Sequence, residues 1–129
     1  MEDSVFTKII KRELPAEIIY EDDSVIAILD LFPSVEGAML VISKLQLPYF
    51  ANLDDVTYAH LMAIVKRLSK VLDATFSTLR TCVVIEGFEV PHVHVRLYPV
   101  QQLPFDMSPG PQASPEELRS VGERVRANL

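Results

Sequence analysis

Apolar residues recur every three or four positions in three parts of the chain, and this spacing is typical of helices with one buried face. The three predicted helices span residues 4–15, 52–76 and 114–129. The middle helix is the longest, and either Asn52 or Asp54 is expected to cap its start. A proline ends the first helix, and the last one opens with the Ser-Pro-Glu-Glu sequence of a capped helix.

Five shorter apolar runs are bounded by turn residues and predict strands. They lie within residues 17–21, 25–31, 37–43, 81–87 and 92–99. The first two flank an Asp-Asp-Ser turn, which favours a hairpin. Helices and strands in this order predict an α+β fold with a mostly antiparallel sheet.

The composition fits one folded domain. The chain has 129 residues, of which 49% are hydrophobic and 23% are charged, and these proportions are typical of globular proteins. We expect a single domain over residues 1–129, with residues 103–129 as a C-terminal extension that ends in a helix. The net charge of −6 argues against a nucleic acid polymer or an anionic membrane as the partner, because both attract clustered lysine and arginine. A small anionic ligand held by a local site is compatible with this charge.

Several features favour a cytoplasmic location. Cys82 is the single cysteine, so no disulfide can form within the chain, and a reducing compartment suits it. The first residues alternate charged and apolar side chains and lack the apolar stretch of a signal peptide. No apolar run approaches the roughly 20 residues that a membrane helix needs.

The segment VPHVHVRLYP, residues 90–99, contains two of the three histidines. Residues two apart point to the same face of a strand, so His92, His94 and Arg96 are expected to share one face. Three interpretations of this polar face are open. The side chains can cover a solvated surface, chelate a metal ion, or perform nucleophilic catalysis. The spacing alone favours the solvated surface, because alternation requires no site.

The two chemical interpretations make different demands. A metal site needs a third ligand from His60, Cys82 or a carboxylate, and His60 is more simply explained as a partly buried helix residue. Catalysis needs a neutral imidazole with one ring nitrogen free to attack phosphorus. Arg96 would then hold a phosphate by two parallel hydrogen bonds.

Motifs along the chain favour the catalytic interpretation of this polar face over the solvated surface. PHVHVRLYP resembles the alternating histidine motif of the histidine triad (HIT) superfamily of nucleotide hydrolases and transferases. The segments KIIKRELP, YEDD, LDLFP and GAMLVISK resemble its other landmarks, in the same order. The resemblance covers residues 5–99, and the tail is similar to one bacterial branch of HIT-like hydrolases. It implies a HIT-like fold with a five-stranded sheet, a short N-terminal helix and one long helix, paired as a homodimer.

The resemblance also implies a reaction on a purine nucleotide. The middle histidine, here His94, attacks the α-phosphorus of a nucleoside phosphoramidate, phosphoanhydride or dinucleoside polyphosphate, and water then releases the nucleoside monophosphate. His92 takes the first motif position, where it lines and positions the site, and Arg96 takes the third. Asp30 matches the acid that binds the ribose hydroxyls. The slot for the base matches Val5, Phe6, Ile9, Ile28 and Leu31.

Within this slot, Phe6 and Leu31 are expected to contact the base, whereas Ile9 and Ile28 are better explained as core. Glu89 departs from the HIT pattern, because it stands where the family has a hydroxyl that contacts phosphate. A carboxylate there repels phosphate unless it turns away or pairs with Arg96.

The third motif position and the metal ligands depart from the pattern as well. A guanidinium stays protonated, so Arg96 can stabilise charge but cannot shuttle a proton as the usual histidine would. Many bacterial HIT proteins bind zinc through four side chains, and these positions are here Ser4, Thr7, Gln46 and His92. We therefore expect no metal ion and no cofactor. The alternative function is a catalytically weakened nucleotide-binding HIT protein that acts as a sensor or as a partner-binding dimer.

Overall fold

The computed structural model describes all residues, 1–129, and contains three α-helices and five strands. The elements are α1 (Val5–Ile10), β1 (Ile18–Glu21), β2 (Val25–Leu29), β3 (Met39–Ser43), the 3-10 turn η1 (Phe50–Asn52), α2 (Asp55–Thr75), β4 (Arg80–Val84), β5 (His94–Val100) and α3 (Pro115–Arg126). The predicted α+β fold is confirmed, and every predicted helix and strand is present. None of the three α-helices combines the length and the apolar character of a membrane-spanning segment.

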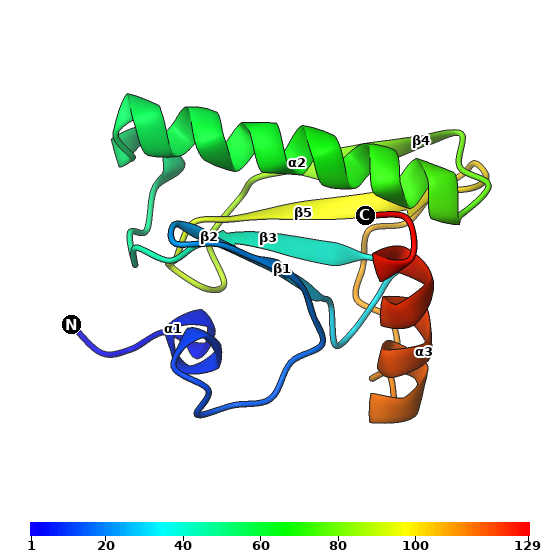
Figure 1. The fold of residues 1–129 in the computed structure, drawn as a ribbon, viewed down its shortest axis with the longest axis horizontal. Helices are drawn as coiled ribbons and strands as arrows, with labels where there is room; N and C mark the ends of the chain where they lie inside the picture. Colours follow the sequence, from blue (N-terminus) through cyan, green and yellow to red (C-terminus); the bar gives the residue numbers. More distant parts are fainter.

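The five strands form one antiparallel sheet in the order β1-β2-β3-β5-β4. Figure 1 shows α2 lying along one face of this sheet, α1 on the opposite side, and α3 across one end. The pairing of β3 with β5 sets Ile42 opposite His94 and Leu40 opposite Arg96. The histidine motif therefore lies inside the sheet, between an apolar strand and the edge strand β4.

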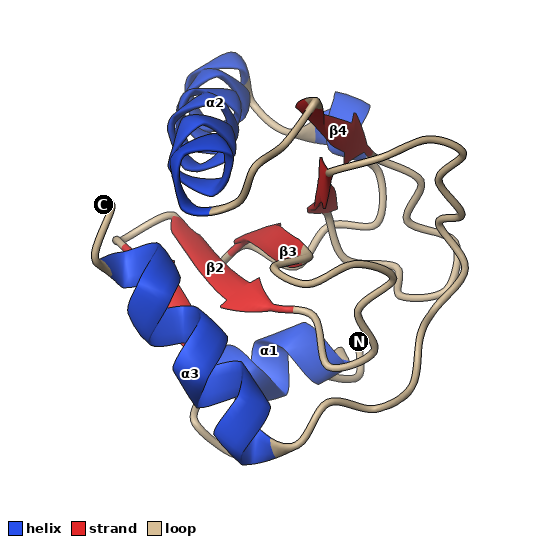
Figure 2. Cartoon of the chain, turned by 90° about the vertical axis from the view of Figure 1, so that its right-hand side faces the viewer, coloured by secondary structure: helices blue, strands red, loops and turns tan.

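Alternate residues of the strands build two main apolar clusters, one on each face of the sheet, beside a small third one of Ala38, Tyr98 and Val100. The face under α2 holds a cluster of 18 buried residues, so it forms the main core. The face under α1 holds a cluster of only six, namely Phe6, Ile9, Ile26, Ile28, Leu40 and Ile42. Figure 2 shows the sheet between α2 and α1, with α3 crossing beside β2. The short α1 thus covers only part of the second face.

The ends of the helices follow local chemistry. Asp54, not Asn52, caps α2, because its carboxylate accepts a hydrogen bond from the Thr57 amide at 3.0 Å. The start of α3 has the predicted capping box between Ser114 and Glu117. The prediction for the first helix was too long, because Arg12 has a φ of 64° and this left-handed residue ends the helix before the proline.

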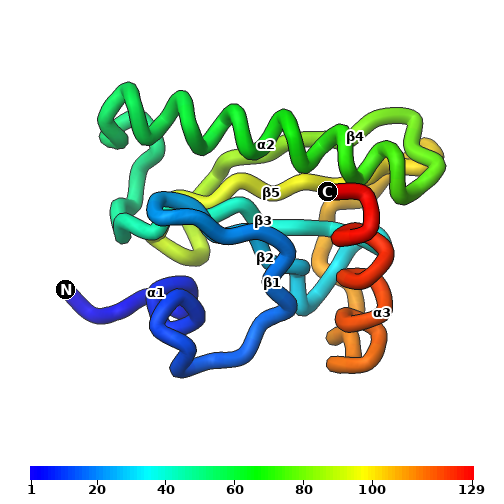
Figure 3. The backbone as a smooth tube through the Cα atoms, viewed as in Figure 1, coloured from blue at the N-terminus to red at the C-terminus, as the bar shows by residue number.

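The C-terminal extension fixes the loop that follows β2. The Ala113 amide donates to the Leu31 carbonyl at 2.9 Å, and the Gly110 amide donates to the Phe32 carbonyl at 3.2 Å. A side chain at Gly110 would not fit, since a Cβ there would lie 2.2 Å from the Pro33 carbonyl oxygen. In Figure 3 the orange segment that leads into α3 runs beside the cyan loop between β2 and β3. This contact holds the loop that carries Asp30.

Candidate active site

His94 is the first residue of β5, and its ring is buried, with 1% exposed. Its Nδ1 lies 2.7 Å from the His92 carbonyl oxygen. Because a carbonyl can only accept, Nδ1 carries the hydrogen and Nε2 carries the free lone pair. Nε2 of His94 is the one buried side-chain nitrogen or oxygen in the protein without a hydrogen-bond partner. Buried polar atoms are nearly always paired, so this nitrogen is available to a bound molecule.

The surroundings of His94 favour its neutral form. Burial lowers the pKa of the His94 imidazole, and the positive charge of Arg96 lowers it further. The Phe6 ring meets the His94 ring edge-on, with the ring centres 4.8 Å apart. A neutral imidazole with a fixed Nδ1 hydrogen and a free Nε2 is the form that can act as a nucleophile.

His92 lies just before β5, and its side chain is turned into the protein. Its Nε2 lies 2.6 Å from the Ser43 carbonyl oxygen, and its Nδ1 lies 2.6 Å from Ser4 Oγ. Both ring nitrogens are therefore occupied, which leaves none for a substrate. Burial also lowers the pKa of the His92 imidazole. The solvated-surface interpretation was wrong, because both rings are buried. The two histidines do share one face, since Phe6 meets both rings edge-on, although β5 begins only at His94.

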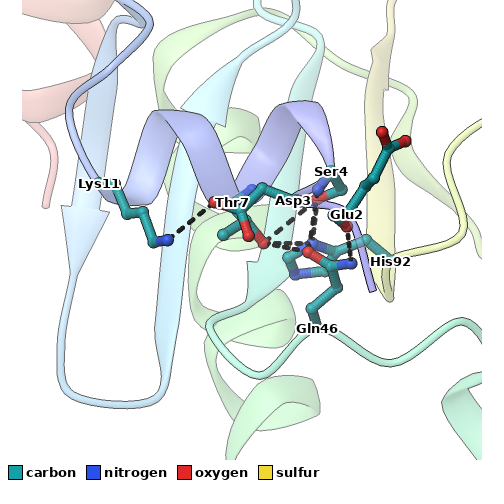
Figure 4. Close-up of polar contacts among 7 residues, drawn as sticks. All are labelled: Glu2, Asp3, Ser4, Thr7, Lys11, Gln46 and His92. Carbon is teal, nitrogen blue, oxygen red and sulfur yellow. Dashed lines mark hydrogen bonds and ion pairs between the residues drawn. The ribbon is translucent and has the colours of Figure 1, made fainter.

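The side chains at the four positions of the family's zinc ligands lie together at the start of α1 (Figure 4). Gln46 Oε1 accepts hydrogen bonds from the Ser4 amide at 2.9 Å and from the Thr7 hydroxyl at 2.5 Å. Ser4 Oγ also caps α1 by accepting from the Thr7 amide at 3.0 Å. Hydroxyl and amide groups are poor ligands for zinc, which prefers thiolate, imidazole and carboxylate groups.

Arg96 lies two residues after His94, and its guanidinium pairs with two carboxylates. Arg96 Nη1 donates to Asp30 Oδ2 at 3.2 Å, and Nη2 lies 3.9 Å from Glu89 Oε2. The other Asp30 oxygen accepts from the Phe32 amide at 2.9 Å. The Asp30 side chain is mostly buried, whereas that of Glu89 is 76% exposed. The structure thus joins Asp30, Arg96 and Glu89 at one end of the site.

The expected apolar slot is divided between buried and exposed side chains. Phe6, Ile9 and Ile28 are buried in the cluster under α1. Val5 and Leu31 are each 42% exposed, so they contribute to an open rim. The buried position of Ile9 and Ile28 agrees with their expected role as core residues.

Two neighbouring features were missed in the sequence. A hollow of about 370 Å³ beyond Ile9 is lined by the end of α1 and the segment before β1, including Leu14 and Ile18. Leu14 belongs to the KIIKRELP segment, so this motif could have indicated the hollow. Tyr98 follows Arg96 on the same strand face, is buried, and packs on Phe105 with ring centres 5.4 Å apart. The alternation of the motif predicts its position.

Comparisons with known proteins agree with this geometry. The HIT domain family model matches residues 11–103. An uncharacterized HIT-like protein of Borreliella burgdorferi is 35% identical over 106 residues, which cover 77% of this chain and 76% of that protein. An adenosine 5'-monophosphoramidase of Schizosaccharomyces pombe is 27% identical, with 97% of each chain covered.

A solved structure has the same fold. The crystal structure of a Hit-like protein involved in cell-cycle regulation from Bartonella henselae superposes with a TM-score of 0.90 at 26% identity. The superposition covers 98% of this chain and 96% of that one. The predicted HIT-like fold, with its five-stranded sheet and three helices, is confirmed.

Proposed function

The chain belongs to the HIT domain family, and on that premise we propose that it is a nucleotide hydrolase or nucleotidyltransferase that acts through His94. One observation carries this proposal. His94 Nε2 is buried without a partner, while Nδ1 is held by the His92 carbonyl. This arrangement supports attack by Nε2 on phosphorus, because the nucleophilic lone pair is fixed in direction and protected from protonation.

The proposed reaction has two displacements. In the first, the Nε2 lone pair of His94 forms a bond to the α-phosphorus, and the bond from phosphorus to the leaving group breaks. In the second, water attacks the same phosphorus, loses a proton, and frees His94, so a nucleoside monophosphate is released. Arg96 would stabilise the negative charge on the phosphoryl oxygens. A leaving group that needs a proton would take it from water, because Arg96 cannot supply one.

The remaining site residues are proposed to hold the nucleotide. Asp30 would bind the ribose hydroxyls, and Phe6 and Ile9 would contact the base from its buried side. Val5 and Leu31 would cover the base from the rim, where both are half-exposed. His92 would position His94, since its own ring nitrogens are occupied. Glu89 is proposed to lie near the phosphate, paired with Arg96.

The substrate class follows from the family and the similar proteins. The relative from Schizosaccharomyces pombe is an adenosine 5'-monophosphoramidase, and an Escherichia coli relative is a purine nucleoside phosphoramidase. A purine nucleoside phosphoramidate is therefore the preferred candidate, ahead of a phosphoanhydride or a dinucleoside polyphosphate. The proposed reaction uses no metal ion and no cofactor.

A second candidate is a nucleotide-binding protein with little turnover, which acts as a sensor or a partner-binding dimer. The pairing of Arg96 with Asp30 favours it, because the guanidinium is already engaged by the residue expected to bind ribose. Binding of a nucleotide would then have to exchange one contact for another. This exchange lowers the binding free energy that each new contact with the nucleotide contributes.

We further propose that the chain is one HIT domain, with residues 103–129 as an extension similar to one bacterial branch, and that it works as a cytoplasmic homodimer. The outer edge of β4 is unpaired in the sheet, and Val83 on this strand and Phe88 in the loop that follows it are exposed. Edge strands with exposed apolar residues tend to pair with a second chain. A monomeric mass in light scattering at micromolar concentration would contradict the dimer. No nucleic acid polymer or membrane is proposed as a partner, given the net charge of −6.

The function is tested by trapping the intermediate. Incubation with adenosine 5'-phosphoramidate should release AMP, and rapid acid-free quenching should leave adenylate bound to one histidine. Mass spectrometry of peptides should place this added mass on His94. Nucleotide-dependent thermal stabilisation without AMP release would favour the sensor, whereas neither effect would contradict both candidates.

A further inference from the structure

Ser4 connects the start of α1 to the histidine motif, although 88 residues separate it from His92 in the sequence. Figure 4 shows Ser4 directed toward the His92 ring, with Thr7 and Gln46 beside it. The distance from Ser4 Oγ to His92 Nδ1 is 2.6 Å, which is short for a hydrogen bond between a hydroxyl and a ring nitrogen. The contact is well placed to control the His92 ring.

The direction of each hydrogen bond in this cluster follows from its partners. His92 Nε2 must donate, because the Ser43 carbonyl oxygen at 2.6 Å can only accept. In a neutral ring Nδ1 is then the acceptor, so the Ser4 hydroxyl must donate to it. Burial keeps the ring neutral by lowering its pKa. The Ser4 hydroxyl oxygen still accepts from the Thr7 amide, so both of its functions are used.

The same reasoning gives His94 the opposite tautomer. Its Nδ1 donates to the His92 carbonyl, and its Nε2 has no hydrogen. The two rings, two residues apart, therefore carry their protons on different nitrogens. The position of the His92 carbonyl depends on how firmly residue 92 is held, and its side chain is held by Ser4 on one side and by Ser43 on the other.

We propose that Ser4 is a positioning residue: by donating to His92 Nδ1 it holds the His92 ring in one orientation, and so fixes the carbonyl that orients His94. This inference deepens the proposed function and rests on it for the catalytic effect. Loss of the Ser4 hydroxyl leaves the ring held by the Ser43 carbonyl alone, so the ring keeps its tautomer but can turn about that single contact. The His92 carbonyl then moves, and His94 Nε2 loses its fixed direction toward phosphorus. Small misplacements of a reacting group reduce the rate without weakening substrate binding.

Thr7 supplies a matched control. Its hydroxyl lies 3.5 Å from His92 Nδ1 but donates to Gln46 at 2.5 Å, so it does not hold the ring in the native protein. It is also the one group close enough to replace Ser4. The test variant is therefore Ser4→Gly with Thr7→Val, and Thr7→Val alone is the control. Glycine keeps most of the helix-capping preference of serine, which separates the hydroxyl from the cap. Ser4→Thr restores a hydroxyl.

The readout is the protonation of each ring nitrogen in the ligand-free protein, measured by long-range ¹H–¹⁵N correlation spectra. The native protein and the Thr7→Val and Ser4→Thr variants should show His92 protonated at Nε2 alone and His94 at Nδ1 alone. The double variant should keep the Nε2 hydrogen, because the Ser43 carbonyl still requires a donor, but the ¹⁵N chemical shift of His92 Nδ1 should move to that of a ring nitrogen without a hydrogen-bond donor. With adenosine 5'-phosphoramidate its kcat should fall about 10-fold while KM stays within about twofold.

Two results would overturn the role of Ser4. One is a native His92 that carries its hydrogen on Nδ1. The other is a double variant that keeps either the native chemical shift of His92 Nδ1 or the native kcat. The spectra require no substrate, so an inactive native protein would contradict the proposed function while the Nδ1 shift still decides whether Ser4 holds the His92 ring.

Discussion

The sheet presents one face to α2 and the other to α1, and alternate residues of the same strands build the two faces. On β5, Val95 and Leu97 point into the cluster under α2, where they are fully buried among aliphatic side chains. His94 and Arg96 alternate with them in the sequence and point to the face under α1. One strand thus supplies both the main core and the candidate site.

The difference between the faces lies in how they are covered. The α2 helix has 21 residues and packs along β3, β4 and β5, with α3 against β1, whereas α1 has six residues and covers one part of the other face (Figure 1). This face holds His94, which is buried beside Phe6 of α1, and the partly exposed side chains of Arg96 and Asp30. A long amphipathic helix yields a sealed core, and a short one leaves polar groups of the same sheet within reach of a ligand.

Substitutions on the two faces of β5 should separate stability from activity. His94→Asn should reduce release of AMP by about 10⁴-fold or more, because the nucleophile is lost. Its free energy of unfolding should fall by no more than about 2 kcal/mol. Leu97→Ala should instead cost about 2–5 kcal/mol of unfolding free energy, since it opens a cavity in the main core.

Urea unfolding and kcat/KM of the folded protein measure both effects. Leu97→Ala should keep kcat/KM within about twofold of the native value under conditions where it remains folded. An active His94→Asn variant, or a folded Leu97→Ala variant without activity, would show that the two faces do not divide these roles.

A substitution at the third motif position tests whether residue 96 can supply a proton to the leaving group. Arg96→His introduces a group that can donate a proton to a leaving group, which the guanidinium cannot do. The ratio of kcat/KM for an amine-linked phosphoramidate to that for a p-nitrophenyl ester should rise about 10-fold, because only the first leaving group needs a proton. Nucleotide binding should weaken slightly through loss of a charged phosphate contact.

Both substrates are measured with the same protein sample, so differences in the folded fraction cancel in the ratio. Equal acceleration of both substrates, or no acceleration, would mean that residue 96 donates no proton and that Arg96 acts through its charge alone. The contact of Arg96 with Asp30 would also be lost, and this loss affects both substrates alike.

Much of this division was predictable from alternation in the sequence. The period of two placed His94 and Arg96 on the face opposite Val95 and Leu97, and the helical period identified the buried side of α2. The inward turn of His92 was not predictable, because it depends on Ser4 at the distant start of the chain and on the Ser43 carbonyl.

Two further details depend on backbone conformation and long-range packing. The early end of α1 follows from the left-handed backbone of Arg12, a residue with no particular preference for it. The pairing of Arg96 with Asp30 joins residues 66 positions apart and requires the register of three strands. Alternation predicts which face a side chain takes, whereas its partners follow from the tertiary fold.

Acid should lower the free energy of unfolding through the two buried histidines, with a smaller effect than either substitution. Burial lowers the pKa of His92 and of His94 from the ordinary value of 6.5. As the pH falls below 6.5, the unfolded chain therefore binds more protons at these residues than the native protein does. The stabilisation is complete above this pH and is lost as the pH falls toward the native pKa values. Urea unfolding on both sides of this value should show a steeper loss for the native protein than for a His92→Gln, His94→Asn double variant. Carboxylates are identical in the two proteins, so the difference isolates the rings, and parallel losses would mean that burial does not keep them neutral.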